Sequence, residues 1–271
     1  MTELSVVIPW RDRPELLQTL RDNAPHFTAA GAEVTVVNCG GDLASVPWSD
    51  LAGLGMPLAR LDFERADFNK GCAINLGVHH SSAETLLLLD ADILLGPETL
   101  PTLQTAFTSR AFVTVAAVID AGRDTGATPP SLAVARVTHA VEFGLPDGTV
   151  HRINTNTLYL TDGARAGPGL VLLRRADFLA VGGMKNTLTG WGWDDIDLIA
   201  RLQMALGLDR HETGRAEHVP HGAAPASLAQ ADKGASEARN YRICLADYAV
   251  GDFQGTFETD VAETTVARHR L

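Results

Sequence analysis

Short apolar runs alternate with segments of helical spacing along the first 120 residues. Leu16, Leu17 and Leu20 show the helical spacing, and Pro14 is suited to the first turn of that helix. The pattern predicts strands over 4–9, 33–37, 86–89 and 112–119, and helices over 14–23, 71–80 and 97–108. Strands that alternate with helices form βαβ units, so we expect an α/β fold built on a parallel sheet.

This alternation ends near residue 120. The stretch 120–169 is rich in Gly, Pro and Thr, and its two segments of alternating polarity, 133–142 and 149–160, predict antiparallel ribbons or long loops. Later elements are a predicted strand over 170–174 and predicted helices over 175–181 and 194–206. The last fifty residues are rich in Ala, Gly and polar side chains, and they predict an irregular, partly helical tail.

The clearest chemical feature is Asp90-Ala91-Asp92, which follows the four leucines at 86–89. Side chains two apart on a strand point the same way, so Asp90 and Asp92 are expected to leave the carboxyl end of a buried strand together. Ligands of open α/β sheets bind at that edge, and two carboxylates there need a cation or hydrogen-bond donors between them. A divalent ion that holds a phosphate-bearing ligand explains the pair, although the triplet alone is common by chance.

Composition excludes several classes of protein. With 271 residues and 45% hydrophobic positions, the chain is one large domain or one domain with an appendage. Its net charge of −11 argues against nucleic acid or an anionic membrane as the main partner. Three scattered cysteines do not make a disulfide framework, and no apolar run approaches the about 20 residues of a membrane span. Because the start of the chain runs straight into a strand without a leader pattern, we expect a cytoplasmic protein.

Two arginines, Arg11 and Arg13, follow the first predicted strand. At the ligand edge of the sheet, a guanidinium can form forked hydrogen bonds with phosphate or with base carbonyls, whereas in a solvated turn it is ordinary surface charge. Neither a Gly-x-Gly-x-x-Gly nor a Gly-Lys-Ser motif follows this strand, which argues against a dinucleotide oxidoreductase or a P-loop enzyme.

A second chemical segment is Thr-Gly-Trp-Gly-Trp-Asp-Asp-Ile-Asp at 189–197. Acidic residues in a first helical turn are ordinary, but three of them behind two tryptophans suggest a sugar site, since an indole can stack on a sugar ring while carboxylates accept bonds from its hydroxyls. An indole beside a carboxylate also tends to raise its pKa, which suits a general base. Asp194 and Asp197 share a helix face, whereas Asp195 points elsewhere, so the three need not have the same role.

Two histidines, His218 and His221, flank a Val-Pro pair after the last predicted helix. Each alone is more often a surface or core residue than a ligand. Together they could complete a metal site begun by Asp92, and imidazole with carboxylate suits Mn²⁺ or Zn²⁺ better than Mg²⁺ or Ca²⁺.

These segments occur in the same order as in the GT-A-fold glycosyltransferases, and the chain most closely resembles the β-1,4-galactosyltransferase-like group and its bacterial family 2 relatives. Ile-Pro-Trp-Arg-Asp-Arg at 8–13 is similar to that group's Pro-Phe-Arg-Asn-Arg, and Phe-Asn-Lys-Gly-Cys-Ala-Ile-Asn-Leu-Gly at 68–77 to its Phe-Asn-Arg-Ala-Lys-Leu-Leu-Asn-Val-Gly. Asp-Ala-Asp at 90–92 matches its Asp-Val-Asp. The run from Gly169 through Gly183 to Asp197 follows its Gly-Gly strand and its Trp-Gly-Gly-Glu-Asp-Asp-Asp.

The resemblance covers 4–120 and 165–222 and implies a GT-A, Rossmann-like, mostly parallel sheet flanked by helices, with a small antiparallel or loop-rich acceptor region. It implies one catalytic domain over 1–222, with a nucleotide-sugar half at 1–120 and an acceptor half at 121–222. Residues 223–271 are then a tail that packs on or near the active site.

The resemblance also implies roles for individual residues. The donor, a UDP-sugar, is expected to lie against Pro9, Arg11, Arg13, Phe68, Lys70, Asp90 and Ala91. Mn²⁺ or Mg²⁺ is expected on Asp92 with His218, His221 or both, and the acceptor on Trp191, Gly192, Trp193 and Asp194. Asp195 is expected to be the catalytic base.

Three positions depart from the pattern of that group. Trp193 replaces a small residue, Asp194 replaces the usual Glu, and His218 stands where a Met is expected. These changes imply a reshaped acceptor pocket and an altered metal preference.

We therefore expect an inverting, metal-dependent glycosyltransferase that moves a sugar from a UDP-sugar to a hydroxyl of a sugar or a glycosylated small molecule. The alternatives are a metal-dependent nucleotide-sugar hydrolase or nucleotidyltransferase, and a non-catalytic sugar- or nucleotide-binding module. Transfer needs donor and acceptor, hydrolysis needs donor only, and a binding module turns over neither.

Overall fold

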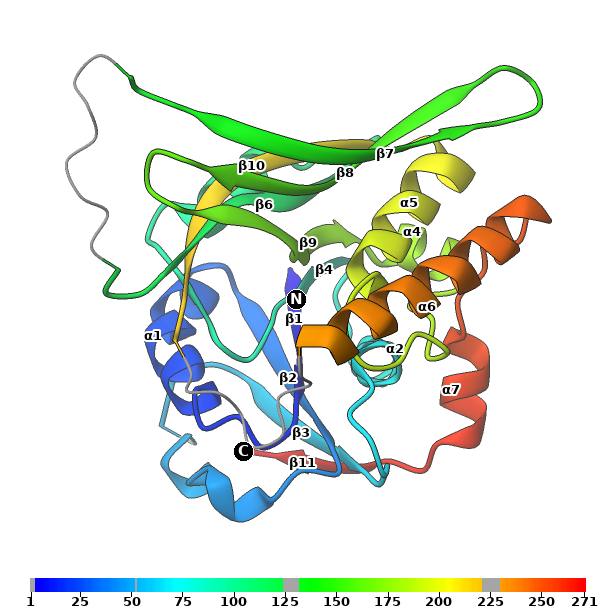
Figure 1. Cartoon of the computed structure of the whole chain (residues 1–271). Helices are drawn as coiled ribbons and strands as arrows, with labels where there is room; N and C mark the ends of the chain where they lie inside the picture. Colours follow the sequence, from blue (N-terminus) through cyan, green and yellow to red (C-terminus); the bar gives the residue numbers. More distant parts are fainter. Residues whose placement is uncertain (1–2, 52, 124–131, 221–229) are drawn as a thin grey trace.

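The computed structural model describes residues 3–51, 53–123, 132–220 and 230–271, and in this part of the chain eleven strands form one sheet (Figure 1). Its order is β11-β3-β2-β1-β4-β9-β6-β10-β5, while β8 joins β9 and carries β7. The strands are β1 (Leu4–Trp10), β2 (Ala32–Cys39), β3 (Leu58–Phe63), β4 (Thr85–Leu88), β5 (Ile93–Leu95), β6 (Ala111–Asp120), β7 (Arg136–Gly144), β8 (Val150–Tyr159), β9 (Arg165–Arg174), β10 (Asp209–His218) and β11 (Ala267–Arg270).

The helices cover both faces of this sheet. They are α1 (Leu16–Ala29), α2 (Lys70–His80), α3 (Thr99–Ala106), α4 (Arg175–Ala180), α5 (Asp194–Leu206), α6 (Gln230–Ala249) and α7 (Phe257–Glu263), with short 3-10 turns η1 (Leu43–Ser45) and η2 (Trp48–Leu51). This arrangement confirms the expected α/β class.

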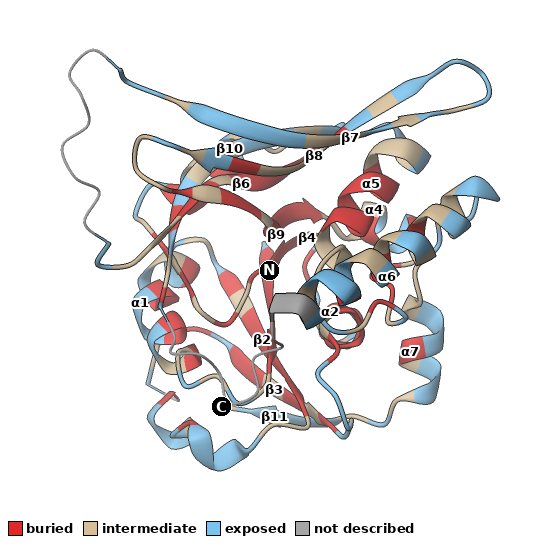
Figure 2. Cartoon of the chain, viewed as in Figure 1, coloured by how far each residue is buried: buried red, intermediate tan, exposed pale blue. Residues whose placement is uncertain are grey.

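The N-terminal half is the parallel unit that the sequence predicts. Strand β1 is buried along its whole length and pairs in parallel with β2 on one side and β4 on the other. Because its side chains alternate between faces, Val6 and Ile8 join the core beneath α1, whereas Val7 joins the core beneath α2. Two layers of helix therefore bury the sheet, and the carboxyl ends of β1, β2, β3 and β4 lie at one edge (Figure 2).

The sheet is mixed rather than mostly parallel. Strand β9 is antiparallel to both β4 and β6, β5 is antiparallel to β10, and β11 is antiparallel to β3. An apolar run predicts a buried strand but carries no information about the direction of its neighbours. The pattern also failed to predict β10, because this strand is polar along its length and Ala216 is its buried position.

The predicted antiparallel ribbon is present as the hairpin β7–β8, which extends beyond the rest of the sheet (Figure 1). Its inner face packs on α5 through the fully buried Ile153, while Val137 and Val150 on the hairpin are exposed. The expected loop-rich region is thus an ordered hairpin over much of its length.

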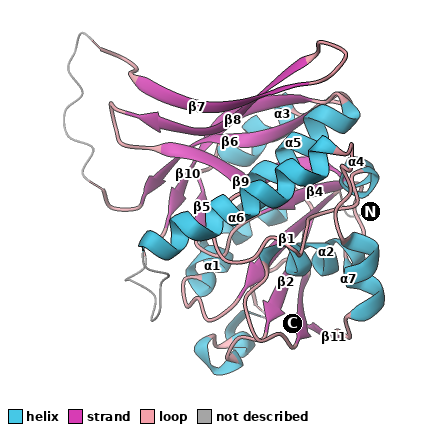
Figure 3. Cartoon of the chain, turned by 45° about the vertical axis from the view of Figure 1, so that its right-hand side comes forward, coloured by secondary structure: helices cyan, strands magenta, loops and turns pink. Residues whose placement is uncertain are grey.

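The C-terminal segment is more regular than the sequence predicts. It contains the twenty-residue helix α6, which lies along α5 (Figure 3), and the strand β11 at the edge of the sheet. The sequence did not predict α6 clearly because its residues are mostly small or polar and do not form an apolar stripe of helical spacing. No helix in the described ranges is long and apolar enough to cross a membrane.

Candidate active site

A lysine and two carboxylates from three distant segments meet at the carboxyl edge of the sheet. Lys70 is the first residue of α2, and its Nζ lies 2.8 Å from Asp90 Oδ1 and 2.9 Å from Asp195 Oδ1. Asp90 follows β4, and Asp195 lies in the first turn of α5. The ammonium therefore joins the first carboxylate of the Asp-Ala-Asp triplet to the carboxylate that the sequence analysis assigns as base.

The start of α2 is held in place by two asparagines. The side chain of Asn69 caps the helix by accepting a bond from the amide of Cys72, and its Nδ2 donates to the carbonyl of Asn186 at 2.7 Å. Lys70 is consequently presented from a fixed helix terminus rather than from a loop.

The environment of this group alters its ionisation. Burial lowers the pKa of Lys70 by itself, but the charges of Asp195 and Asp90 outweigh burial and raise that pKa well above its usual value. Burial raises the pKa of Asp195 to about 7, with Asp194 and Asp90 adding to the rise and Lys70 opposing it. Burial likewise raises the pKa of Asp90 against the pull of Lys70. A carboxylate with a pKa near neutrality is matched to general base chemistry.

Gly169 on β9 leaves the space that this group occupies. A Cβ at this position would lie 2.7 Å from Asp195 Oδ2 and 2.9 Å from Lys70 Nζ, closer than real Cβ contacts. Any larger residue would displace the ion pair. Gly169 has no site role in the sequence pattern, because the requirement for a small residue there arises only from its tertiary contact with Asp195 and Lys70.

The second carboxylate of the triplet lies beside a histidine. His218 Nε2 is 3.6 Å from Asp92 Oδ2, and His218 Nδ1 is 2.9 Å from Asp120 Oδ1. The amide of Val219 donates to the carbonyl of Asp92, which fastens the end of β10 to the segment after β4. The hydrogen bond with Asp92 raises the pKa of the His218 ring, although partial burial lowers it.

Asp120 gives this pair the outer partner that metal-bound histidines usually have. When Nδ1 carries the proton it donates to Asp120, and Nε2 is directed toward Asp92. Asp120 in turn accepts from Arg165 at 3.2 Å. Imidazole nitrogen and carboxylate oxygen together fit a divalent transition metal. No three His, Cys, Asp or Glu side chains gather as a metal site within the described residues, and the predicted His221 lies outside them.

The predicted donor residues near β1 occupy different surroundings. Arg11 Nη1 donates to the carbonyl of Ala66 at 2.9 Å, so Arg11 ties the end of β1 to the segment before α2. Arg13 is half-buried and Phe68 is 40% exposed. Pro9 lies inside β1, and Ala91 is buried with its carbonyl bonded to Thr19 Oγ1, so neither side chain lines the edge.

Three of the predicted acceptor residues, Trp191, Gly192 and Trp193, lie in a loop at 189–193, which we call the tryptophan loop, and the fourth, Asp194, is the first residue of α5. Trp191 is 50% exposed, whereas Trp193 is half-buried, packs on the core beneath α2 and contacts Tyr241 at 4.7 Å between ring centroids. Trp193 also has a left-handed backbone, with φ of 70°. This conformation gives a physical reason for the small residue that the resemblance leads one to expect there, because glycine adopts it without a Cβ penalty.

The variants Trp193→Gly and Trp193→Ala separate the packing of this ring from its backbone strain. Both lose the ring contacts and are expected to be less stable than the wild type. Glycine also removes the Cβ penalty of the left-handed region, so the Gly variant should be the more stable of the two by about 1 kcal/mol. Thermal or urea unfolding measures the difference. A Gly variant that is less stable than the Ala variant would show that this backbone conformation is not strained.

Asp197, the third acidic residue of the segment, is not at the site. It is fully buried, forms an ion pair with Arg201 at 2.7 Å and accepts a hydrogen bond from the hydroxyl of Tyr248. Its position one turn from the start of α5 places it beneath the helix, where it supports the fold.

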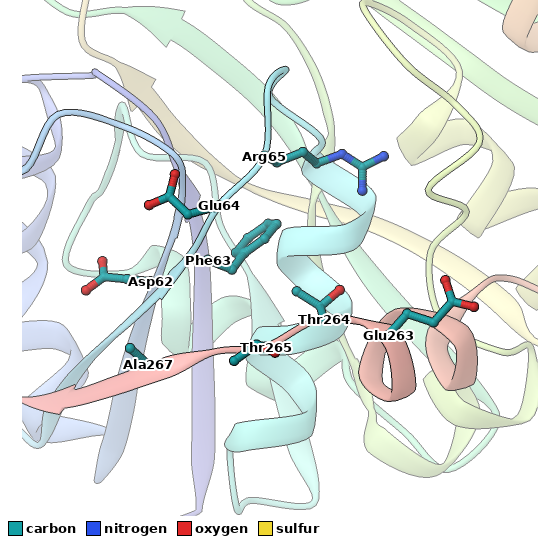
Figure 4. A pocket seen from close by; sticks show the side chains of 8 residues that line it. All are labelled: Asp62, Phe63, Glu64, Arg65, Glu263, Thr264, Thr265 and Ala267. Carbon is teal, nitrogen blue, oxygen red and sulfur yellow. The ribbon is translucent and has the colours of Figure 1, made fainter.

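A separate cleft of about 490 Å³ lies where the end of β3 meets the start of β11 (Figure 4). It is lined by Asp62, Phe63, Glu64, Arg65, Glu263, Thr264, Thr265 and Ala267. Asp62 is already paired with Arg60 and His269, and none of the predicted site residues lines the cleft.

Comparison with known proteins gives a family-model match and similar solved structures. The model of the N-terminal domain of galactosyltransferase matches residues 150–222, which is less than half of the chain. Glucosyl-3-phosphoglycerate synthase from Mycobacterium tuberculosis, solved with Mn²⁺, UDP-glucose and phosphoglyceric acid, is 16% identical with a TM-score of 0.54 over 90% of this chain and 79% of that one. No curated protein matches the sequence.

A mannosyltransferase from Pyrobaculum calidifontis, solved with GDP-mannose and Mn²⁺, is 17% identical with a TM-score of 0.49. The match covers 98% of this chain and 66% of the mannosyltransferase. The likeness to the glucosyl-3-phosphoglycerate synthase, at 16% identity and a TM-score of 0.54, is one of fold, and it confirms the expected GT-A fold.

Proposed function

We propose that this GT-A-fold chain is a glycosyltransferase that moves a sugar from a UDP-sugar to an acceptor hydroxyl with inversion at the anomeric carbon. The observation that carries the proposal is the contact of Lys70 with Asp90 and Asp195 at the carboxyl edge of the sheet. Asp92, two residues after Asp90, lies beside His218. Open α/β sheets bind nucleotides at this edge, and the fold and the family-model match point to the same class of reaction.

Asp195 is the proposed general base. In one displacement the acceptor oxygen forms a bond to the anomeric carbon, the bond from that carbon to the diphosphate oxygen breaks, and the acceptor proton moves to the Asp195 carboxylate. The diphosphate leaves with the electron pair of the broken bond. A buried carboxylate whose pKa is about 7 can accept this proton near neutral pH, and it keeps its orientation through Lys70.

Asp92 and His218 are the described residues that would hold Mn²⁺ or Mg²⁺, with His221 a further proposed ligand from the sequence. The ion would supply positive charge for the diphosphate. Asp120 would orient His218 from behind, as the carboxylate partner of its other ring nitrogen.

Lys70 has a more specific place than the sequence predicts. Its ammonium bonds to Asp90 and Asp195 in this structure, so it compensates the charge of both carboxylates. Its three N–H donors face one oxygen of Asp90 and both oxygens of Asp195, so it could donate to the diphosphate by giving up one of the Asp195 contacts. That Asp195 oxygen would then face the acceptor hydroxyl.

The proposal is tested by incubating the protein with Mn²⁺ and UDP-glucose or UDP-galactose, with and without a panel of p-nitrophenyl glycosides. We expect a glycosylated product that requires donor and acceptor, and nuclear magnetic resonance should show an inverted anomeric configuration. UDP release at the same rate without any acceptor would support a hydrolase instead. Donor binding without turnover would support a binding module.

The pH dependence of transfer follows from the pKa of Asp195. The base is active when ionised, and its pKa in the folded protein is raised to about 7, so the rate should fall as the pH drops through 7 and level off above it. Initial rates between pH 5.5 and 8.5, at saturating Mn²⁺ and donor, measure this fall in rate on the acid side. A rate that is constant over that range contradicts the assignment of Asp195 as base.

A further inference from the structure

One face of the C-terminal helix α6 holds the tryptophan loop by a set of hydrogen bonds. Ser236 Oγ accepts from the amide of Trp191 at 2.9 Å and donates to the carbonyl of Thr189 at 3.0 Å. Asn240 Nδ2 donates to the carbonyl of Gly192 at 2.8 Å and to that of Thr189 at 3.2 Å. Both side chains are at least nine-tenths buried, so the bonds are shielded from water.

The loop and the helix fit each other closely at two glycines. Gly190 and Gly192 have φ of 82° and 92°, which glycine adopts without strain. A Cβ at Gly190 would collide with Ser236 Oγ, and one at Gly192 would lie 3.1 Å from Glu237 Cβ. The loop backbone therefore lies directly on α6, and the two glycines allow this approach.

The C-terminal end of α6 is bonded to α5, the helix that carries Asp195. Lys185 Nζ bonds to Asp247 at 2.5 Å, and the hydroxyl of Tyr248 donates to Asp197 of α5 at 2.8 Å. Lys185 and Asp197 are buried, whereas the Asp247 side chain is 33% exposed, so this end of α6 is anchored through contacts with two buried charged groups. The helix is thus fixed to the same element that carries Asp195.

The described contacts leave Trp191 projecting from the clamped loop. Its side chain is half exposed. Its backbone amide donates to Ser236, and the carbonyl of the following residue, Gly192, accepts from Asn240. Lys233, one turn before Ser236 on α6, places its Nζ 5.9 Å from the Trp191 ring. An exposed indole on a rigid backbone is a surface prepared for a ligand, because little conformational freedom is lost when the ligand binds.

We infer that α6 forms the acceptor side of the active site and that Ser236 and Asn240 are positioning residues, which set acceptor affinity by fixing the loop that carries Trp191. The inference rests on the proposed glycosyltransferase function. It gives the C-terminal segment a specific part in the reaction, although neither residue touches the reacting atoms.

The test compares Asn240→Asp and Ser236→Ala with the matched control Arg242→Ala in the full-length protein. The Asp variant keeps the volume of Asn240 but removes the two bonds that it donates to the loop. Arg242 is exposed on the same helix and serves as the control. The assay uses Mn²⁺, whichever of UDP-glucose and UDP-galactose the wild type transfers, and a p-nitrophenyl glycoside acceptor from the panel above.

Asn240→Asp and Ser236→Ala should each raise the acceptor KM about fivefold to tenfold, which is the effect of losing one or two hydrogen bonds of ordinary strength. The donor KM and UDP release in the absence of acceptor should stay within about twofold of the wild type, and Arg242→Ala should match the wild type in both. Amide exchange at Trp191 should become faster in Ser236→Ala, which reports the loss of the loop bond directly.

Two results would overturn the inference. One is an unchanged acceptor KM in both Asn240→Asp and Ser236→Ala while the wild type transfers sugar. The other is an equal loss of donor and acceptor affinity, which indicates a general structural role for α6. A wild type that forms no product with any donor and acceptor contradicts the proposed function itself, so the two failures are distinct.

Discussion

Replacing Asp195 by Asn is expected to reduce turnover by about 10²–10⁴, the usual contribution of general base catalysis, while donor affinity stays close to that of the wild type. The amide has the shape of the carboxylate but cannot accept the acceptor proton. Lys70 retains Asp90 as a partner at 2.8 Å, so the start of α2 should remain in place. Single-turnover rates and calorimetric titration with UDP and Mn²⁺ measure the two effects separately.

Asp194→Asn is the matched control, because Asp194 lies beside Asp195 in the same helical turn. We expect this variant to act through the acceptor, with a higher acceptor KM and a smaller loss of turnover. If Asp194→Asn abolished activity while Asp195→Asn kept most of it, the two roles would have to be exchanged.

Replacing Asp92 by Ala is expected to abolish the dependence of UDP binding on Mn²⁺. His218 would lose the carboxylate that lies 3.6 Å from its Nε2, and an imidazole alone does not hold an ion and a diphosphate together. His218→Ala and His221→Ala should each weaken the metal affinity by a smaller amount. Calorimetric titration with UDP, with and without Mn²⁺, measures the change.

Asp50→Ala supplies the control for this experiment. It removes one carboxylate of the same type from an exposed 3-10 turn, where its partner is Arg21 at 3.7 Å. Exposed ion pairs contribute little, so this variant should bind UDP and Mn²⁺ as the wild type does. UDP binding that remains equally dependent on Mn²⁺ in Asp92→Ala would remove Asp92 from the metal site.

Part of the candidate site was predictable from local sequence. Asp90 and Asp92 follow an apolar run, so the local pattern placed both at the ligand edge of the sheet, whereas Lys70 and Asp195 were expected at the site only from the family resemblance. The structure brings Lys70 next to Asp90 and Asp195, and His218 next to Asp92. Lys70, Asp90 and Asp92 share one edge because the parallel strands of the N-terminal half all end there, whereas Asp195 and His218 reach it from segments after residue 120.

The partners of these residues were not predictable in the same way. Nothing in the local pattern shows that Lys70 is shared by two carboxylates, since Asp195 is 125 residues away in sequence. Asp120 ends a strand that the sequence predicts, but its bond to His218 depends on the parallel pairing of β6 with the polar strand β10. Gly169 is required by the space left on β9, which no spacing of residues encodes.

The sequence by itself therefore determined the class of fold, the parallel strands β1, β2 and β4 with the helices α1, α2 and α3, and the pair of carboxylates Asp90 and Asp92 at the ligand edge. These follow from hydrophobic periodicity and from the order in which strands and helices alternate, both of which are local properties of the chain. The tertiary structure alone decided the mixed direction of the sheet, the contact of α6 with the tryptophan loop, and the burial and charged neighbours that determine the pKa of Asp195. Each of these depends on contacts between segments far apart in sequence, where packing and burial rather than local propensity select the partner.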